Sequence, residues 1–463
     1  MDRPRLLIAD ERREGVVSPG VFLAASLKAL GVPLQLFVGG FDEEYLRMLS
    51  LSCEQEVYSL HPSLFASNAA FRDVFTYLAR GDRLNLILAP LGKLASEDHL
   101  ELDEETLSVA RILGIGIIAA PRANPVAVLT SRIMGDVYAQ LLRAQIDLYG
   151  VVFSSVLNPR EYQLLEVGVG RTIPSPILGY IPRYMDRQNV TLEQLCTDPS
   201  LVHPVQITAN QLQGMVGQVD WSAIAAFGQY AAPLNESMHP IHPLQEAPKV
   251  AVLSDQTLAS SGGNDLAFFR TIGCSVIDVS LLQGRIPATA DILYIPHGLP
   301  HLALKRLHLN EDLFDQVRAL PQRSLPVLVN GGFSAAWGRW ISTPDQGNSG
   351  RDVGLNAFDE GFELSEVSRE GIPVEIEERP TRTTVVLPLF DDERLRGTLS
   401  GYMRGGLNIP GDGQCAWLAK DLRDGKVLGE AGWRVHKLVG SQVCLDLWSC
   451  SNVIKRWIRQ EAR

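Results

Sequence analysis

Short runs of apolar residues recur along the chain, and polar, turn-forming stretches separate them. In the first half these runs cover residues 5–9, 34–38, 84–88, 115–119, 150–156 and 177–181. Stretches with helical spacing, such as 21–30 and 126–146, lie between most of them. Near-continuous apolar strands that alternate with helices are typical of a parallel sheet covered on both faces. The pattern predicts an α/β domain built on a doubly wound parallel sheet.

The same pattern starts again near residue 249. Apolar runs cover residues 249–253, 275–279, 292–295 and 326–329, and a helix is predicted near 265–272. The stretch between the two halves is rich in proline and has little periodicity, which is typical of a connector. We therefore expect a first α/β domain at 1–230, a proline-rich linker at 231–248, and a second doubly wound α/β domain at 249–463.

Composition and charge narrow the class of protein. The chain has 463 residues, 46% hydrophobic and 21% charged, which is ordinary for globular proteins. No apolar run is long enough to span a membrane, and Asp10 and Glu11 interrupt the first one, so no signal peptide is expected. The net charge of -11 disfavours nucleic acid and anionic lipid as partners.

Cysteine and histidine spacing bears on location and metal binding. The six cysteines are scattered and form no CxxC pair, so we expect reduced thiols in a cytoplasmic protein. His239 and His242 are close in sequence, but the prolines around them make this segment a poor metal site. We expect no metal centre.

Ligands of open parallel sheets bind beyond the carboxyl ends of the strands, so the turn at residues 10–18 is the first candidate. A phosphate loop there would need glycines, a lysine for the terminal phosphates, and Ser or Thr for magnesium. Gly15 fits, but Val16 stands where the lysine belongs, and acidic residues precede it. The sequence therefore favours a plain connecting turn over a phosphate site.

The next two strand ends offer little more. Asp42 follows the second strand and is a lone carboxylate, which is more typical of a helix cap than of a catalyst. After the third strand, Ala89 stands where an acidic residue could have held magnesium.

A sharper feature lies in the second half, where the buried strand 326–329 runs into Asn330-Gly331-Gly332 and a predicted helix. A strand, a tight turn and a helix in this order predict a nucleophile elbow, which exposes one side chain above the sheet. The exposed residue would be Asn330. Asparagine has no nucleophilic oxygen, sulfur or amine, so the elbow would lack its chemistry.

Six segments in the same order resemble one known family. They are Leu34–Asp42, Ala110–Gly114, Ile177–Arg183, Val219–Trp221, Ala290–Ile295 and Pro326–Gly332. Over almost its full length the chain is similar to the cobyrinate a,c-diamide synthases and their sirohydrochlorin-amidating relatives. The resemblance implies an ATP-dependent, P-loop-like synthetase domain joined to a class I glutamine-amidotransferase-like domain. Members of that family convert two carboxylates of a corrin or isobacteriochlorin ring to amides.

The resemblance also marks where chemical groups of the family are missing from the first domain. Val16-Val17 stand where the family has the Lys-Thr of its phosphate loop, and Ala89 stands where it has a glutamate on the third strand. Val38 replaces a lysine on the second strand. Arg122 replaces an aspartate after the fourth strand, and Ser154 replaces the asparagine that recognises the base. Each replacement removes a group that the family uses for the nucleotide.

In the second domain, the family's glutamine-attacking cysteine corresponds to Asn330. The family's Gly-Gly-Gly-Tyr-Pro-Glu corresponds to residues 296–301 of this chain. Its His-rich stretch corresponds to residues 398–402, and its His-x-His corresponds to residues 444–446. Cys444 lies in a strand-like run without a neighbouring histidine, which favours a structural, half-buried thiol. His297 and His301 at a strand end could approach an anionic substrate or a metal, although surface-loop histidines are the default.

Joint loss of both sets of groups predicts a non-catalytic member of the family that needs no cofactor. Its partner would be a working paralogue, a second copy of itself, or a tetrapyrrole polycarboxylate that Arg183 and Arg404 could pair with. Gly15 and Asp42 would be the remnants of a nucleotide site. The alternative is a working amide synthase that uses ATP and magnesium with free ammonia or a partner's glutaminase. A third reading is a purely structural interaction protein.

Overall fold

The computed structural model describes residues 3–13, 15–215, 217–234, 241–258, 262–342, 351–358, 361–363, 371–378, 399–403 and 415–462. The chain divides into two compact units. The first comprises Met1–Gly40, Glu44–Pro62 and Ser67–Met238, and the second comprises Phe41–Glu43, Ser63–Ala66 and His239–Arg463. Both combine helices with strands, which confirms the α/β class.

A parallel sheet of seven strands forms the centre of the first unit, in the order β3-β2-β4-β1-β7-β8-β9. The strands are β1 Arg5–Asp10, β2 Leu34–Gly39, β3 Val57–Leu60, β4 Leu84–Pro90, β7 Ile117–Ala120, β8 Leu148–Val156 and β9 Ile177–Pro182. A separate hairpin joins β5 Gly92–Leu94 to β6 Leu100–Leu102. Six of the seven strands coincide with predicted apolar runs; the edge strand β3 was not predicted.

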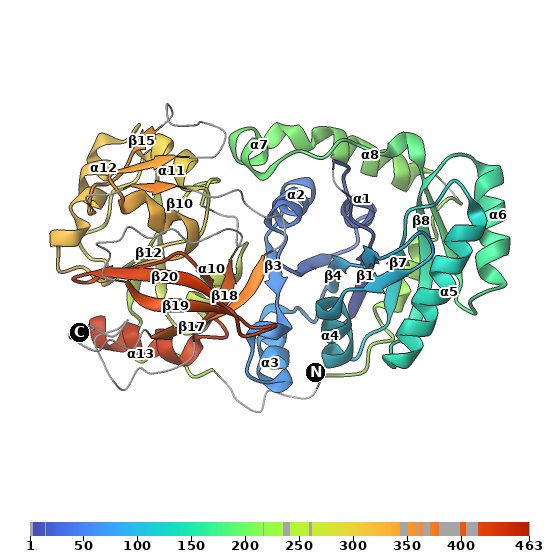
Figure 1. Ribbon diagram of the computed structural model, residues 1–463, viewed down its shortest axis with the longest axis horizontal. Helices are drawn as coiled ribbons and strands as arrows, with labels where there is room; N and C mark the ends of the chain where they lie inside the picture. Colours follow the sequence, from blue (N-terminus) through green and yellow to red (C-terminus); the bar gives the residue numbers. More distant parts are fainter. Residues whose placement is uncertain are drawn as a thin grey trace. The chain divides into compact units, whose positions relative to one another are not determined.

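Helices cover both faces of this sheet (Figure 1). They are α1 Pro19–Ala29, α2 Glu43–Cys53, α3 Asn68–Leu78, α4 Glu104–Leu113, α5 Ala127–Arg143, α6 Pro159–Gly170, α7 Leu192–Thr197, α8 His203–Gly214 and α9 Trp221–Phe227. In the view of Figure 1, α1, α2 and α8 lie above the sheet and α3, α4 and α5 lie below it. The doubly wound arrangement predicted for the first unit is confirmed.

Alternation of side chains along each strand supplies both faces with apolar residues. Leu6 and Ile8 of β1 belong to the core that also contains residues of α1, α2 and α8. On the other face, Phe37 of β2 meets Phe75 of α3 with ring centroids 5.1 Å apart. Because both faces are buried, the strands read as continuous apolar runs in the sequence.

Arg5 is an exception at the start of this apolar sheet, because its side chain is 1% exposed and yet charged. Its guanidinium donates to backbone carbonyls: Nε and Nη2 to Leu113 O at the end of α4, Nη2 to Ala232 O, and Nη1 to Arg3 O. These bonds fasten the first strand to the last residues of the unit.

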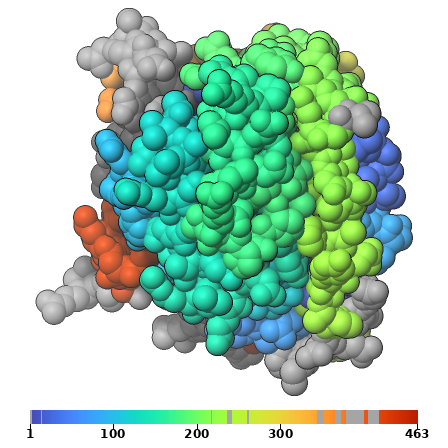
Figure 2. Space-filling view, turned by 90° about the vertical axis from the view of Figure 1, so that its right-hand side faces the viewer, coloured from blue at the N-terminus to red at the C-terminus, as the bar shows by residue number. Residues whose placement is uncertain are grey.

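The helix pair α5 and α6 presents a broad outer face, teal and green in Figure 2. The two helices approach closely through glycines, since a β-carbon on Gly168 would lie 2.6 Å from Ser131 Oγ. Large apolar side chains of these two helices are exposed, among them Val128, Leu142 and Leu164.

In the second unit a ten-stranded sheet has the order β11-β10-β12-β13-β21-β20-β19-β17-β18-β22. The first five strands are parallel, and the rest pair antiparallel. The strands are β10 Lys249–Ser254, β11 Ser275–Ser280, β12 Ile292–Ile295, β13 Val327–Val329, β17 Ile372–Glu378, β18 Leu399–Met403, β19 Cys415–Asp421, β20 Val427–Val435, β21 Leu438–Ser441 and β22 Cys444–Leu445. The second unit is therefore α/β as expected, and its sheet has an antiparallel half that the apolar runs did not predict.

Helices α10 Asn264–Thr271, α11 Pro300–Leu307, α12 Glu311–Arg318 and α13 Ser451–Glu461 accompany this sheet. The short strands β14 Trp340–Ser342, β15 Arg351–Val353 and β16 Phe362–Glu363 form a separate sheet. A 3-10 helix, η5 Gly331–Trp337, follows β13, where a helix was predicted. Among the described residues, no helix combines the length and apolar character needed to cross a membrane.

The proline-rich stretch 231–248 is described in part. Residues 231–234 and 241–248 contain no helix or strand, and residues 235–240 lie outside the described ranges.

Candidate functional site

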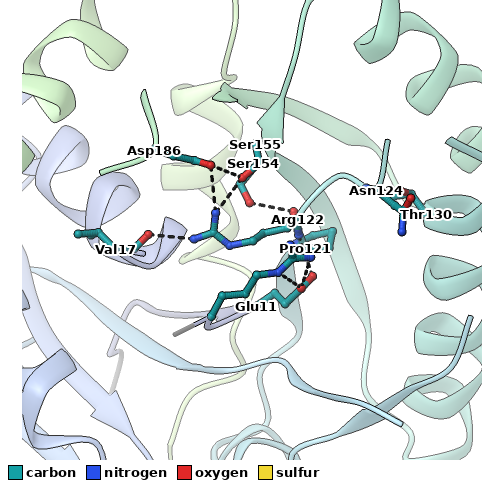
Figure 3. A network of polar contacts seen from close by, with 10 residues as sticks. Glu11, Val17, Pro121, Arg122, Asn124, Thr130, Ser154, Ser155 and Asp186 are labelled. Atoms are coloured by element: carbon teal, nitrogen blue, oxygen red, sulfur yellow. Dashed lines mark hydrogen bonds and ion pairs between the residues drawn. The ribbon is translucent and has the colours of Figure 1, made fainter. Parts of the chain in front are cut away.

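Polar side chains from four strand ends of the first unit converge beyond the carboxyl edge of its sheet (Figure 3). Glu11 follows β1, Arg122 follows β7, Ser155 is the last residue but one of β8, and Asp186 follows the turn after β9. Adjacent parallel strands end at one edge, so these residues meet although they are far apart in sequence. This edge is where a ligand of an open α/β sheet would bind.

Arg122 is the centre of this network. Its side chain is 3% exposed, and its Nη1 atom lies 2.8 Å from Ser155 Oγ and 3.4 Å from an oxygen of Asp186. Its Nη2 atom donates to the carbonyl oxygen of Val17, 3.0 Å away, in the turn between β1 and α1. Burial lowers the pKa of Arg122, and the nearby Asp186 carboxylate opposes this change. The guanidinium thus fastens the turn to the β8 and β9 ends.

The Glu11 carboxylate completes the network from the other side. One oxygen accepts from the backbone N–H of Arg122 at 2.9 Å, and the other accepts from Arg13. Ser155 donates its hydroxyl to Asp186 and has a φ of 60°, an uncommon backbone conformation for a residue with a side chain. The strand end is therefore shaped so that Ser155 reaches the ion pair.

The N-terminus of α1 carries an internal carboxylate. Asp10 is fully buried, and its Oδ2 atom accepts from the Gly20 N–H at 2.9 Å and from the Tyr45 hydroxyl at 3.2 Å. Arg12 pairs with its other oxygen. Burial raises the pKa of Asp10, while Arg12 and the Gly20 N–H lower it. The positive end of a helix dipole favours an anion, and here Asp10 supplies it.

Backbone groups of the turn are paired with the segment that follows β9. The Val17 N–H donates to Arg187 O at 2.9 Å, and the Asn189 N–H donates to Gly15 O at 3.0 Å. Val16 also forms an isolated antiparallel bridge with Gln188. Amides that a phosphate loop would direct at its ligand are here bonded within the protein.

Gly15 has a φ of 73°, which a glycine adopts at no steric cost. Asp42 directly precedes α2, as a helix-capping residue would. Val38 and Ala89, the positions of two polar groups in the family resemblance, are fully buried in their strands. Ser154 is buried and donates to Pro121 O, so its hydroxyl is engaged inside the protein.

In the second unit, the turn after β13 differs from the expected elbow. Asn330 is 0% exposed and has an ordinary extended backbone, with φ at -99° and ψ at 128°. Its Nδ2 atom donates to the Tyr294 hydroxyl at 2.9 Å and to Leu445 O at 3.1 Å, and its Oδ1 atom accepts from the Leu445 N–H at 2.7 Å. The prediction of an exposed Asn330 is wrong, because its side-chain amide forms hydrogen bonds with the backbone C=O and N–H of Leu445 in β22.

Behind Asn330 the network continues through Tyr294 to Asp265 on α10. Burial raises the pKa of the Tyr294 hydroxyl well above its ordinary value, and Asp265 adds to the effect. Cys444 is 3% exposed rather than half-buried, and burial raises the pKa of its thiol. A thiol with a raised pKa is a poor nucleophile. The geometry supports a structural Cys444.

His297 is half-buried, and its Nδ1 atom accepts from the Gly332 N–H at 2.8 Å. Its Nε2 atom lies 2.8 Å from Glu43, which groups with the second unit. His301 is buried on α11, so it is not the surface-loop residue that was expected. Arg183 is exposed at the start of a 3-10 turn of the first unit. Arg404 lies outside the described residues.

Sequence reasoning missed several residues of these two networks. Asp186, Arg187, Tyr294 and Asp265 come from other elements and belong to no local motif. The one available signal was Arg122, a charge directly after a buried strand, since a buried charge requires a partner. Within the described part of the chain, no group of three or more His, Cys, Asp and Glu residues could hold a metal ion.

Comparison with curated proteins gives relatives that share one name. The chain is 24% identical over 342 residues to a protein named cobyrinate a,c-diamide synthase from Magnetococcus marinus, covering 71% of this chain and 72% of that one. Proteins of the same name from Herminiimonas arsenicoxydans and Caldanaerobacter subterraneus are 25% and 24% identical, covering 69% and 76% of this chain and 70% and 75% of their own lengths.

The other comparisons add little. No protein-family model matches the chain. Among solved structures, the MinC:MinD cell division protein complex of Aquifex aeolicus matches with a TM-score of 0.30 and 15% identity, over 50% of this chain and 99% of that one. A TM-score this low carries no structural argument.

Proposed function

The chain belongs to the cobyrinate a,c-diamide synthase family, and from that premise we propose that it is a non-catalytic member that acts by binding. It serves either as a partner subunit of a working relative or as a binding protein for a tetrapyrrole polycarboxylate. Both roles use the inherited scaffold without its two reactions.

The closed turn between β1 and α1 is the observation that carries this proposal. A phosphate site at a helix N-terminus depends on N–H groups that point at the ligand. Here the Gly20 N–H is bonded to Asp10, the Val17 N–H is bonded to Arg187 O, and Arg122 holds the Val17 carbonyl. A nucleotide would have to break all three contacts before it could bind.

The charges at this turn do not fit a triphosphate either. Asp10 and Glu11 place two carboxylates at the end of β1, and residues 10–18 contain no lysine. Both nearby arginines already pair with these acids, Arg12 with Asp10 and Arg13 with Glu11. The carboxylates would repel an incoming phosphate, because these arginines neutralise them only at short range. The residues at this turn therefore do not fit ATP with magnesium.

The turn after β13 supports the same proposal from the second unit. Attack on glutamine needs a nucleophile, and the Asn330 amide cannot supply one. The amide is also committed to Leu445 and Tyr294, so it contributes to the stability of the unit.

Calorimetric titration with Mg-ATP tests the proposal. The purified protein should release no binding heat, while a relative with an intact phosphate loop, titrated in the same buffer, binds normally. Saturable micromolar binding by this chain would overturn the proposal and favour a synthase that uses ammonia or a partner's glutaminase.

Two further measurements separate the proposed roles. Binding of a tetrapyrrole polycarboxylate is followed by quenching of tryptophan fluorescence, with Arg183→Ala as a variant of an exposed cationic residue. Association with a working relative is followed by size-exclusion chromatography of the mixture. If neither partner binds, the binding role is wrong and the chain is a structural interaction protein.

A further inference from the structure

Asn330 and Gly331 form the sole Asn-Gly pair in the 463-residue sequence. In such a pair the backbone nitrogen of the glycine can attack the side-chain amide carbon of the asparagine. Glycine offers the least hindrance to this approach because it has no β-carbon. An Asn-Gly pair is therefore the pair in which the residue after the asparagine hinders this attack least.

The reaction needs no partner except water. The Gly331 nitrogen forms a bond to Asn330 Cγ, the Cγ–Nδ2 bond breaks, and ammonia leaves with the proton lost by the backbone nitrogen. Water then opens the five-membered imide at either carbonyl and leaves an aspartate or an isoaspartate at position 330. No electrons are transferred, and one ammonia is released for each water consumed.

The folded chain holds the side chain in the wrong place for this attack. Three hydrogen bonds fasten the Asn330 amide, one to the Tyr294 hydroxyl and two to the backbone of Leu445 in β22. The residue is 0% exposed, so water has no access to an imide formed there. Ring closure would require the amide to break both hydrogen bonds to Leu445 and to turn towards Gly331. The buried N–H and C=O of Leu445 would then lose this hydrogen-bond partner, which is unfavourable.

The fold needs both members of this labile pair. Gly331 has a φ of 66°, and a β-carbon there would lie 2.0 Å from His297 Nδ1. The Asn330 amide donates twice and accepts once, which no carboxylate of the same shape can do. A safer residue at either position would therefore disturb the turn.

We propose that Asn330 is a deamidation site that is silent in the folded protein and reactive once the second unit unfolds. Conversion removes both donors of the amide and places a carboxylate against Leu445 O, next to the Tyr294–Asp265 pair. An isoaspartate additionally lengthens the backbone before Gly331. A chain that reacts while unfolded cannot rebuild this network, so the modification makes unfolding irreversible.

Peptide mapping by mass spectrometry of the full-length protein tests this proposal. The protein is incubated at mildly alkaline pH, either native or in a urea series, and conversion at residue 330 is followed with time. A synthetic peptide of residues 325–334 supplies the unprotected rate. We expect a native rate at least about 1000-fold below the peptide rate, because a stable protein holds about one chain in a thousand or fewer unfolded. Across the urea series the rate should follow the unfolded fraction.

Refolding supplies the second readout. Urea is diluted out after increasing incubation times, and the folded fraction is compared with the fraction converted at residue 330. We expect the converted chains to be missing from the folded fraction. Conversion of native protein at the peptide rate would overturn the protection, and normal refolding of converted chains would overturn the irreversibility.

Discussion

The turn after β1 and the turn after β13 occupy equivalent places in their sheets but are closed by different chemistry. The first is held by charges, with Asp10 at the helix N-terminus and Arg122 between Val17 O and Asp186. The second is held by the neutral amide of Asn330, bonded to β22 and Tyr294. Charged groups respond to pH, whereas an amide does not. The two units should therefore lose their closed turns under different conditions.

Removal of the Asn330 amide should have the largest effect on stability. Asn330→Ala leaves the N–H and C=O of Leu445 buried without this partner, and each orphaned group costs about 1–3 kcal/mol. We expect a loss of about 3–5 kcal/mol in the second unit. Tryptophan fluorescence in urea measures it, since six of the seven tryptophans lie after residue 330.

A matched control is Asn310→Ala, which also removes an amide with three hydrogen bonds, but at the half-buried cap of α12. Asn310 accepts from the Leu313 N–H and donates to the carbonyls of Leu281 and Gly284. Loss of a cap costs about 1 kcal/mol. Equal losses in the two variants would mean that burial of the Asn330 amide contributes nothing.

Arg122→Met should have the next largest effect, in the first unit. It keeps much of the side chain's length but leaves Asp186 and Val17 O without the guanidinium, which we expect to cost about 2–3 kcal/mol. Hydrogen exchange measured by mass spectrometry should show faster exchange around residues 15–20 and no change around 327–335.

The control for this variant is Arg132→Met on α5, where the arginine is 65% exposed and lies 3.7 Å from Asp98. Exposed ion pairs contribute less than about 1 kcal/mol. If both arginine variants exchange alike, the Arg122 network does not hold the turn.

Asp10→Asn should change how the stability of the first unit depends on pH. Burial raises the pKa of Asp10, so the folded state binds the proton more tightly than the unfolded state. Its stabilising contribution is present below the ordinary carboxyl pKa and is lost as the pH rises through the raised value. Thermal melting from acidic to neutral pH should show this loss in the wild type and not in the variant. Parallel pH profiles for both proteins would contradict the assignment.

The smallest effect is expected for thiol modification. Burial raises the pKa of the Cys444 thiol, so iodoacetamide should leave it unmodified in native protein and alkylate it in urea. Peptide mapping reads the site, with Cys274 as a second buried thiol whose pKa is raised to about 12. Rapid native alkylation of Cys444 alone would revive it as a nucleophile.

Much of the first unit was predictable because its strands are buried on both faces. The run Leu84–Leu88 is apolar throughout and lies in the middle of the sheet as β4. The edge strand β3, Val57–Leu60, carries half-buried Tyr58 and Ser59 and gave no such signal. In the second unit, β20 contains glycines and charges at 427–435, and its antiparallel pairing was not visible in the sequence.

The candidate sites were predictable as places but not as networks. Strand ends fix where Arg122 and Asn330 stand along the chain. The partner of Arg122, Asp186, is 64 positions away, and the partner of Asn330, Leu445, is 115 positions away and bonds through its backbone atoms. No local pattern encodes such pairs. Burial of Asn330 in particular depends on β22, which lies far downstream in the sequence.

Arg5 has a consequence for the order of events during synthesis. Its strand, β1, sits between β4 and β7, and its guanidinium is completed by the carbonyl of Ala232. A nascent chain emerges from the ribosome N-terminus first, so Arg5 waits while more than two hundred residues are translated. Until Ala232 leaves the exit tunnel, Arg5 lacks one of its native acceptors. Its native state is therefore a late product of translation, although its first strand is among the earliest residues made.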